Sequence, residues 1–82
     1  MGEVNELVRE GIKALKAGDR AQARASLLRA LEIDERNEQA WLWLSAVVDK
    51  PAEQEICLEN VLTLNPANEH AQRGLQKVRE AM

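Results

Sequence analysis

Few residues of this sequence could do chemistry, and none has the partners that a reaction needs. The one histidine, His70, stands next to Glu69 near the expected start of a helix, where a solvated side chain is commoner than a base or a ligand. The one cysteine, Cys57, has no second cysteine or histidine at zinc spacing and lies in an apolar run, which is typical of a small buried hydrophobe. The sequence contains no glycine-rich phosphate loop and no nucleophilic set of serine, histidine and acid. We therefore expect no enzyme activity, no metal site and no cofactor.

Composition and charge narrow the class of protein further. Hydrophobic residues make up 45% and charged residues 30% of the chain, which is typical of a folded soluble domain and not of a disordered segment. The net charge of -3 argues against a nucleic-acid partner, because phosphate binding needs a concentrated basic surface. No apolar run reaches the roughly 18 residues of a membrane span, and a single cysteine cannot form an internal disulfide. We expect one cytoplasmic domain, residues 1–82, that binds neither nucleic acid nor a membrane.

The most apolar stretch, Asn37 to Asp49, is expected at the centre of the fold. Its residues NEQAWLWLSAVVD leave almost no polar face, so a helix formed here must be covered on more than one side. The sequence contains no phenylalanine or tyrosine, and its apolar residues recur at helical spacing. Because residues that favour strands are few, we predict an all-α fold.

Capping and breaking residues divide the chain into five predicted helices. Gly18 suits the left-handed residue that closes a helix, and Pro51 suits a first helical turn. The residues suited to N-caps are Asp19, Asn37 and Asn68. The predicted helices cover about residues 4–17, 20–33, 38–49, 51–65 and 69–82. The turns between them are short, so neighbouring helices must run antiparallel.

An internal repeat indicates how these helices are arranged. AQARASLLRALEID, residues 21–34, aligns with AEQEICLENVLTLN, residues 52–65. The matched apolar pairs across the chain are Leu27 with Leu58, Leu31 with Leu62, Ala40 with Ala71, Leu44 with Leu75, and Leu7 with Trp41. Helix pairs that repeat in this way, each unable to bury its own face, stack into a solenoid.

The repeated residues resemble the tetratricopeptide repeat family, whose pattern is W-x2-L-G-x2-Y, then A-x3-F, then P. The matching residues are Trp41, Leu44, Ser45, Val48, Leu58 and Pro66 in the second unit, and Leu7, Gly11, Ala14, Ala23, Leu27 and Ala30 in the first. The resemblance implies a right-handed superhelix of antiparallel helix pairs. Repeat 1 would cover about residues 4–37, repeat 2 about 38–68, and a capping helix about 69–82.

The chain departs from the family pattern at a few positions. Glu10 and Glu35 stand where leucine and proline are usual, and the turn between the third and fourth helices is three residues shorter. Gln54 stands where a small alanine is usual, and it is too large and polar for a close helix crossing. We therefore expect the packing around Gln54 to differ from that of the family.

The resemblance also implies where a ligand would bind, because family members contact ligands through the first helix of each unit. The apolar residues carried over are Val8, Ile12, Leu42, Trp43 and Ala46, the basic residues are Arg73 and Lys77, and the remainder are Asn5, Lys16, Gln39, His70 and Gly74. Val8, Ile12 and Trp43 stand where a carboxylate clamp needs lysine and asparagine, so no such clamp is expected. An apolar groove with a basic edge fits an apolar or amphipathic segment with acidic flanks.

Two interpretations of this surface stay open. It could bind a peptide or helix of a partner protein, or it could meet its own copy across a two-fold axis and bury Leu42 and Trp43 in a homodimer. Two positions are also open for Trp43, either in an open groove or under the first or fifth helix. A third class, an enzyme or a nucleic-acid binder, has no residues here to support it.

Overall fold

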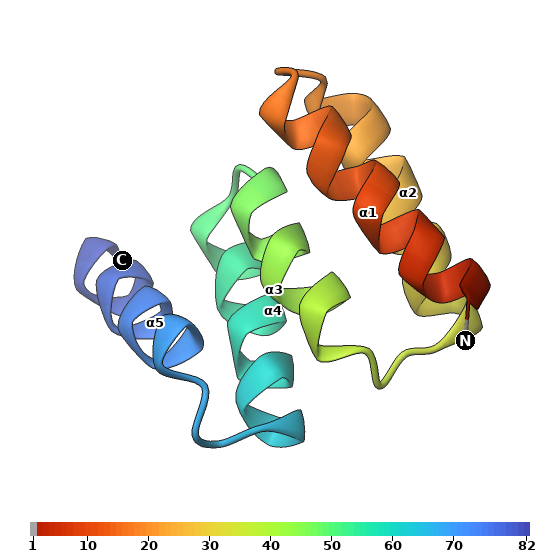
Figure 1. The fold of residues 1–82 in the computed structure, drawn as a ribbon. Coiled ribbons are helices and arrows are strands. Elements are labelled where there is room, and N and C mark those ends of the chain that lie inside the picture. Colours follow the sequence, from red (N-terminus) through yellow and green to blue (C-terminus); the bar gives the residue numbers. More distant parts are fainter. Residues whose placement is uncertain (1) are drawn as a thin grey trace.

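A computed structural model describes residues 2–82, and within these residues it contains α-helices and no strand (Figure 1). The helices are α1 Gly2–Lys16, α2 Arg20–Ile33, α3 Glu38–Val47, α4 Pro51–Leu64 and α5 Glu69–Ala81. The predicted all-α fold of five helices is therefore confirmed. The main difference in bounds is at α3, which ends at Val47 because Val48 has extended backbone angles (φ -75°, ψ 144°).

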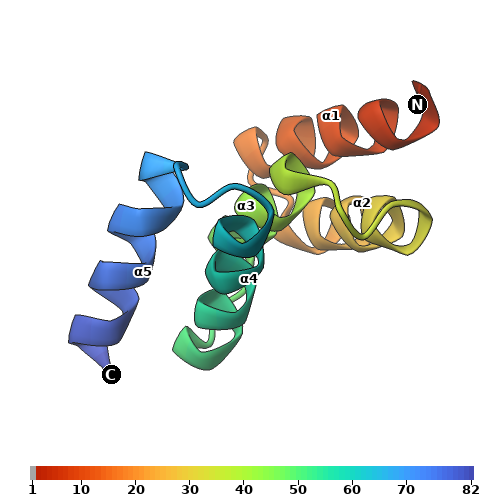
Figure 2. The ribbon, with the colours of Figure 1, turned by 90° about the horizontal axis from the view of Figure 1, so that it is seen from below.

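Each helix packs against the next one along the chain, and α1 also contacts α3. Figure 1 shows neighbouring helices running in opposite directions, and Figure 2 shows α1 and α2 at one end of the molecule and α5 at the other, with α3 and α4 between them. One side of the molecule carries hollows lined by α1, α3 and the start of α5, and the other side carries a hollow between α2 and α4. We call these the inner side and the outer side. Because α2 and α4 each run opposite to α3 in Figure 1, they share a general direction, and Figure 2 shows that they cross obliquely.

The residues predicted as helix caps have that role in the structure. Asp19, Asn37 and Asn68 each accept a hydrogen bond from the backbone N–H three residues later, at 3.0, 2.9 and 3.0 Å. These bonds satisfy N–H groups that the first turn of a helix leaves without a partner. Gly18 has the left-handed backbone (φ 84°) expected of a helix-closing glycine.

The loops after α2 and α4 have the same structure. The C-cap residues Asp34 and Asn65 have backbone angles of -144°, 91° and -146°, 90°, and each side chain accepts from the N–H two residues later. Trp41 and Gln72 then make equivalent bonds: the Trp41 indole donates to the Glu35 carbonyl at 2.8 Å, and the Gln72 amide donates to the Pro66 carbonyl at 2.7 Å. The repeat found in the sequence therefore has matching backbone geometry at both loops.

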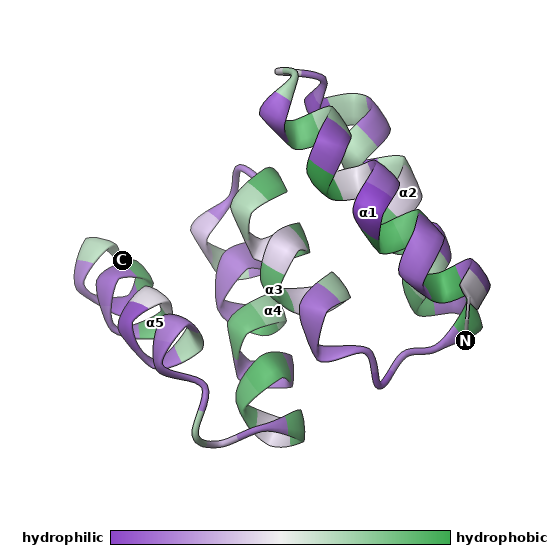
Figure 3. Ribbon diagram, in the orientation of Figure 1, coloured by the Kyte–Doolittle hydropathy of each residue, from purple (hydrophilic) through white to green (hydrophobic). Residues whose placement is uncertain are grey.

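The core runs along both faces of α3. One cluster of buried side chains joins α1, α2, α3 and Cys57 of α4, and a second joins α4 and α5. Trp41 packs against both clusters, so the prediction that the apolar stretch is covered on more than one side is confirmed. Figure 3 shows hydrophobic residues gathered on α3 and α4 and hydrophilic residues along the loops.

Polar side chains from two neighbouring helices hold the carboxyl end of α3. Arg20 donates to the Val47 carbonyl at 2.7 Å and to the Asp49 carboxylate at 2.9 Å, and Gln54 donates to the Val48 carbonyl at 3.0 Å. Carbonyl groups at the end of a helix have no partner within the helix, so these bonds supply one. The turn from α3 to α4 contains only Val48 to Lys50, so the amide of Gln54 can reach back across the turn to the Val48 carbonyl. The long side chain of Gln54 therefore supplies a hydrogen bond at this position.

Gly11 allows α1 and α2 to approach closely. A Cβ atom at this position would lie 2.7 Å from Cγ of Leu27 and 3.4 Å from the Ala23 carbonyl oxygen. We expect Gly11→Ala to lower the free energy of unfolding by about 1–2 kcal/mol, since overpacking costs about 1–3 kcal/mol and alanine regains up to about 1 kcal/mol of helix propensity. Urea denaturation measures this change. Gly2→Ala is the control, because a Cβ there meets no atom within 4 Å; equal stability of the two variants would contradict the close crossing.

Candidate functional site

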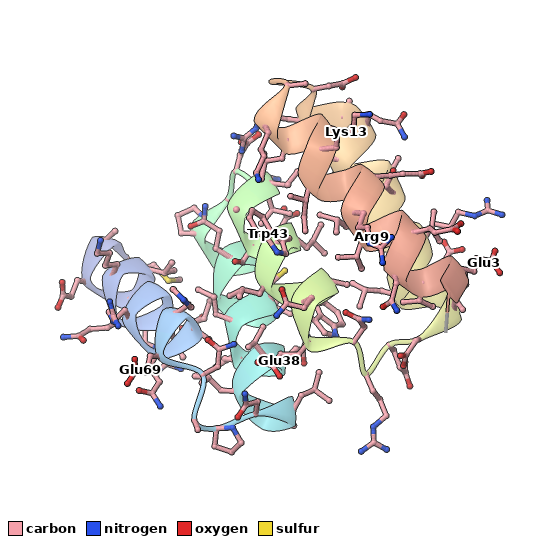
Figure 4. All side chains as sticks on the ribbon, viewed as in Figure 1. Glu3, Arg9, Lys13, Glu38, Trp43 and Glu69 are labelled. Carbon is pink, nitrogen blue, oxygen red and sulfur yellow. The ribbon has the colours of Figure 1, made fainter. Side chains whose placement is uncertain are left out.

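Two adjoining hollows lie on the inner side. The first has a volume of about 460 Å³ and is lined by Gln39, Leu42, Trp43, Ser45, Ala46 and His70. The second has a volume of about 300 Å³ and is lined by Asn5, Val8, Arg9, Ile12, Asn37 and Gln39. Gln39 belongs to both, so the hollows form one surface across α1, α3 and the start of α5, which we call the inner groove. Figure 4 shows Trp43 on α3 and Arg9 on the neighbouring α1.

The structure brings together five of the seven residues predicted for the site. Leu42, Trp43 and Ala46 line the first hollow, and Val8 and Ile12 line the second. Val8 is only 7% exposed and belongs to the core, so it contributes little open surface to the hollow that it lines. It lies where α1 packs against the rest of the bundle, and the family position alone did not indicate this burial.

The two predicted basic residues do not line the inner groove. Arg73 and Lys77 are both exposed on α5, and Arg73 pairs with Glu69 at 3.4 Å. The basic residue that does line the groove is Arg9, which the sequence interpretation missed. Its position directly after Val8, one helical turn from Ile12, was the available signal, since a long side chain beside an apolar stripe reaches over it.

The two tryptophans have different surroundings. Trp41 is half-buried, touches both core clusters and donates its indole N–H to the Glu35 carbonyl. Trp43 is also half-buried and packs against the first core cluster, but its remaining surface lines the inner groove. Each of the two positions considered for Trp43 is therefore partly correct. One part of the ring rests on the core and another part faces the groove.

The inner groove combines apolar side chains with polar ones and one arginine, and none of its lining residues is acidic. Two acids next to groove residues are held by other side chains: the Glu38 carboxylate accepts from Asn65 at 2.9 Å and from Asn68 at 2.6 Å, and Glu69 pairs with Arg73. Glu6 and Glu10 are exposed on α1 on either side of Arg9 in the sequence. Within residues 2–82 no carboxylate forms an ion pair with Arg9. A ligand with an acidic group would therefore meet a cation that lacks an ionic partner in this part of the chain.

The residues that could do chemistry lie apart from one another. Cys57 is 4% exposed, and burial, reinforced by the charge of Glu53, raises the pKa of its thiol to about 11. The thiol therefore stays protonated at neutral pH, where it is a weak nucleophile. His70 is exposed at the edge of the inner groove. Residues 2–82 contain no group of three or more His, Cys, Asp or Glu side chains placed to hold a metal ion.

Comparison with known proteins adds no identification. No family model matches the sequence. No curated protein matches it either. Among the helices between Gly2 and Ala81, none has the length and apolar composition required to cross a bilayer.

Proposed function

We propose that the protein is a non-catalytic protein-interaction module in which the inner groove binds an amphipathic peptide or helix with acidic flanks. We further propose that its helices form a tetratricopeptide-like right-handed stack, with two antiparallel helix pairs and one closing helix. Two observations support this arrangement. The loops after α2 and α4 have matching geometry, and α1 contacts α3 across the first pair. The cytoplasmic location expected from the single cysteine stays a prediction.

Polar residues on α5 support its role as a closing helix. Trp41 and Gln72 make equivalent hydrogen bonds, which places the two helices in register 31 residues apart (41 and 72). In this register Gln76 of α5 takes the position of Ser45 in α3, and Ser45 in turn takes the position of Gly11 in α1. Gly11 is the residue against which α2 packs. Arg79 on the same helix bonds to Glu55 and Glu59 of α4, each at 3.0 Å. Polar residues at this position suit a surface that meets water, as the last helix of a stack must.

The observation that carries the proposed function is the combination of an accessible apolar floor with an unmatched positive charge. Leu42, Ala46 and the open part of Trp43 offer apolar contact, while Arg9 stands at one side of the groove. A helix laid into such a groove would present apolar residues at i, i+3, i+4 and i+7 and acidic residues at its flanks. Arg73 and Lys77 are exposed on α5 and add positive charge to that helix, and Arg73 pairs with Glu69.

The alternative is a homodimer formed through the same groove. It would bury the apolar floor, but it would also place two grooves that carry Arg9 and no acid against each other. Like charges at an interface oppose association. We therefore favour a partner of opposite charge for the inner groove.

Selection from a displayed library of helical peptides tests this function. We expect the recovered peptides to share an apolar stripe at helical spacing and to be enriched in Asp and Glu at its edges. We expect Trp43→Ala to weaken their binding by tenfold or more, since a central aromatic contact contributes about 2 kcal/mol or more. Urea denaturation of the same variant should still show one cooperative transition.

Leu28→Ala is the matched control, because Leu28 is exposed on the outer side and does not line the groove. It should leave peptide affinity unchanged. The proposed function would be contradicted by peptides without acidic enrichment, by peptides that bind Trp43→Ala as well as wild type, or by a selection that recovers no specific peptide.

A further inference from the structure

The outer side carries an apolar hollow that the inner groove does not explain. It lies between α2 and α4, has a volume of about 180 Å³, and has Leu28, Val48, Ile56 and Cys57 among its lining residues. Leu28 is 41% exposed and Ile56 is 56% exposed, although most large apolar side chains in the described chain are covered. Arg24 and Glu53 stand at its edges. We call Arg24, Leu28, Glu53 and Ile56 the outer patch.

The charged and apolar residues of the outer patch form two matching rows. On α2, Arg24 precedes Leu28 by four residues, and on α4, Glu53 precedes Ile56 by three, so each charge lies about one turn before its apolar neighbour. The two helices run in the same general direction in Figure 1, and Figure 2 shows that they cross obliquely. Arg24 and Glu53 also line the same hollow as Leu28 and Ile56.

Neither charge of the outer patch is used inside the molecule. Within residues 2–82, Arg24 and Glu53 form no ion pair with each other or with another residue. Leu28 and Ile56 likewise leave much of their apolar surface open to water. The patch therefore offers both apolar surface and a pair of opposite charges to a second molecule.

We propose that the outer patch is the contact surface of a weak two-fold homodimer. A two-fold axis that lies on the surface over this hollow, and that bisects the directions of α2 and α4, places α2 of one copy alongside α4 of the other. Leu28 then meets Ile56 of the second copy, and Arg24 meets Glu53 of the second copy, with each contact made twice. A two-fold interface requires this self-complementarity, because every contact between two residues is repeated with the copies exchanged.

Charge favours a second copy over other occupants of the outer patch. An acidic segment would meet Glu53, and a basic segment would meet Arg24, so each would gain one favourable contact and one unfavourable contact. A second copy in the two-fold arrangement satisfies both charges. The patch is small compared with the roughly 800 Å² per partner of a standard stable interface, so we expect a dimer that dissociates on dilution.

Sedimentation velocity with charge-swapped variants tests this proposal. Over about 10 µM to 1 mM protein, wild type should shift from monomer toward dimer. Arg24→Glu and Glu53→Arg should each weaken the dimer by roughly tenfold, because each creates two pairs of like charges across the axis. The double variant should restore the wild-type dissociation constant to within about threefold, since the opposite charges again face each other.

Two further variants distinguish dimerisation through the outer patch from association through the inner groove and from the effects of unfolding. Trp43→Ala should leave the dimer unchanged, because Trp43 is not part of the outer patch. Ile56→Ser should abolish the dimer while circular dichroism remains that of the folded helical protein, since the Ile56 side chain is mostly exposed. The proposal is overturned if wild type stays monomeric throughout, if the double swap fails to restore association, or if Trp43→Ala is the variant that dissociates the dimer. None of these outcomes depends on whether the inner groove binds a peptide.

Discussion

Replacing Leu27 with alanine is expected to lower the free energy of unfolding by about 2–5 kcal/mol. The Leu27 side chain is 0% exposed and lies in the first core cluster. It also fills the space beneath Gly11, where α1 and α2 approach most closely, so its removal leaves a cavity that rigid helices cannot close. In a domain of this size the total stability is about 5–15 kcal/mol, and this loss would remove a large part of it.

Leu28→Ala provides the matched control, because it makes the same chemical change one residue later on the same helix. Leu28 is largely exposed on the outer side, so we expect its replacement to change stability by roughly 0.5 kcal/mol or less. Chemical denaturation of both variants at low protein concentration measures the difference without a contribution from association. Similar losses at the two positions would show that α2 does not present Leu27 to the core.

Replacing Trp41 with alanine is the second large change, with an expected loss of about 3–5 kcal/mol. Trp41 packs against both core clusters and donates its indole N–H to the Glu35 carbonyl in the loop after α2. The substitution therefore removes the side chain that joins the two clusters and also releases the loop. Thermal and urea unfolding measure the loss, and the variant should unfold at a much lower denaturant concentration than wild type.

The second repeat supplies a control for the loop bond alone. Gln72 makes the equivalent hydrogen bond to the Pro66 carbonyl, but it is exposed and adds little to the core. Gln72→Ala should therefore cost only about 0.5–1.5 kcal/mol, the net contribution of one hydrogen bond. If Trp41→Ala costs no more than Gln72→Ala, then Trp41 has no role in joining the clusters.

The helices could be predicted well because their boundaries depend on local chemistry. Asn37 and Asn68 act as N-caps, Gly18 has the left-handed backbone, and Pro51 occupies the first turn of α4, all as the residue types indicate. The repeat alignment paired Leu27 with Leu58, and both are buried at close crossings beside a glycine, Gly11 and Gly74 respectively. Such features need only residues that are near in sequence or matched by the repeat.

The site could be predicted only in part, because exposure depends on how α1 tilts against α3. Leu42, Trp43 and Ala46, which the family resemblance implied as groove residues, do line the inner groove. The resemblance did not indicate how far each side chain is buried, and Val8 proved to be buried. Arg9 was missed because it stands beside a family position and not at one.

Long side chains were the other source of error. Gln54 was expected to disturb a helix crossing, yet it bonds to the Val48 carbonyl at 3.0 Å. Arg20 reaches the end of α3 from the start of α2, between residues 27 positions apart (20 and 47). Contacts of this kind depend on where a flexible side chain finds an unpaired carbonyl, and sequence spacing does not show it.

The most direct test of the proposed groove uses the two tryptophans as built-in reporters. Each indole N–H gives its own signal in a nitrogen–proton correlation spectrum of the wild-type protein, and the probe is an acidic amphipathic peptide recovered from the display selection. As the peptide is added, the Trp43 signal should shift until it saturates, because the peptide covers its open surface. The Trp41 signal should move little, since its N–H is bonded to the Glu35 carbonyl. A peptide that binds without moving the Trp43 signal, or that moves both signals equally, would contradict binding in the inner groove.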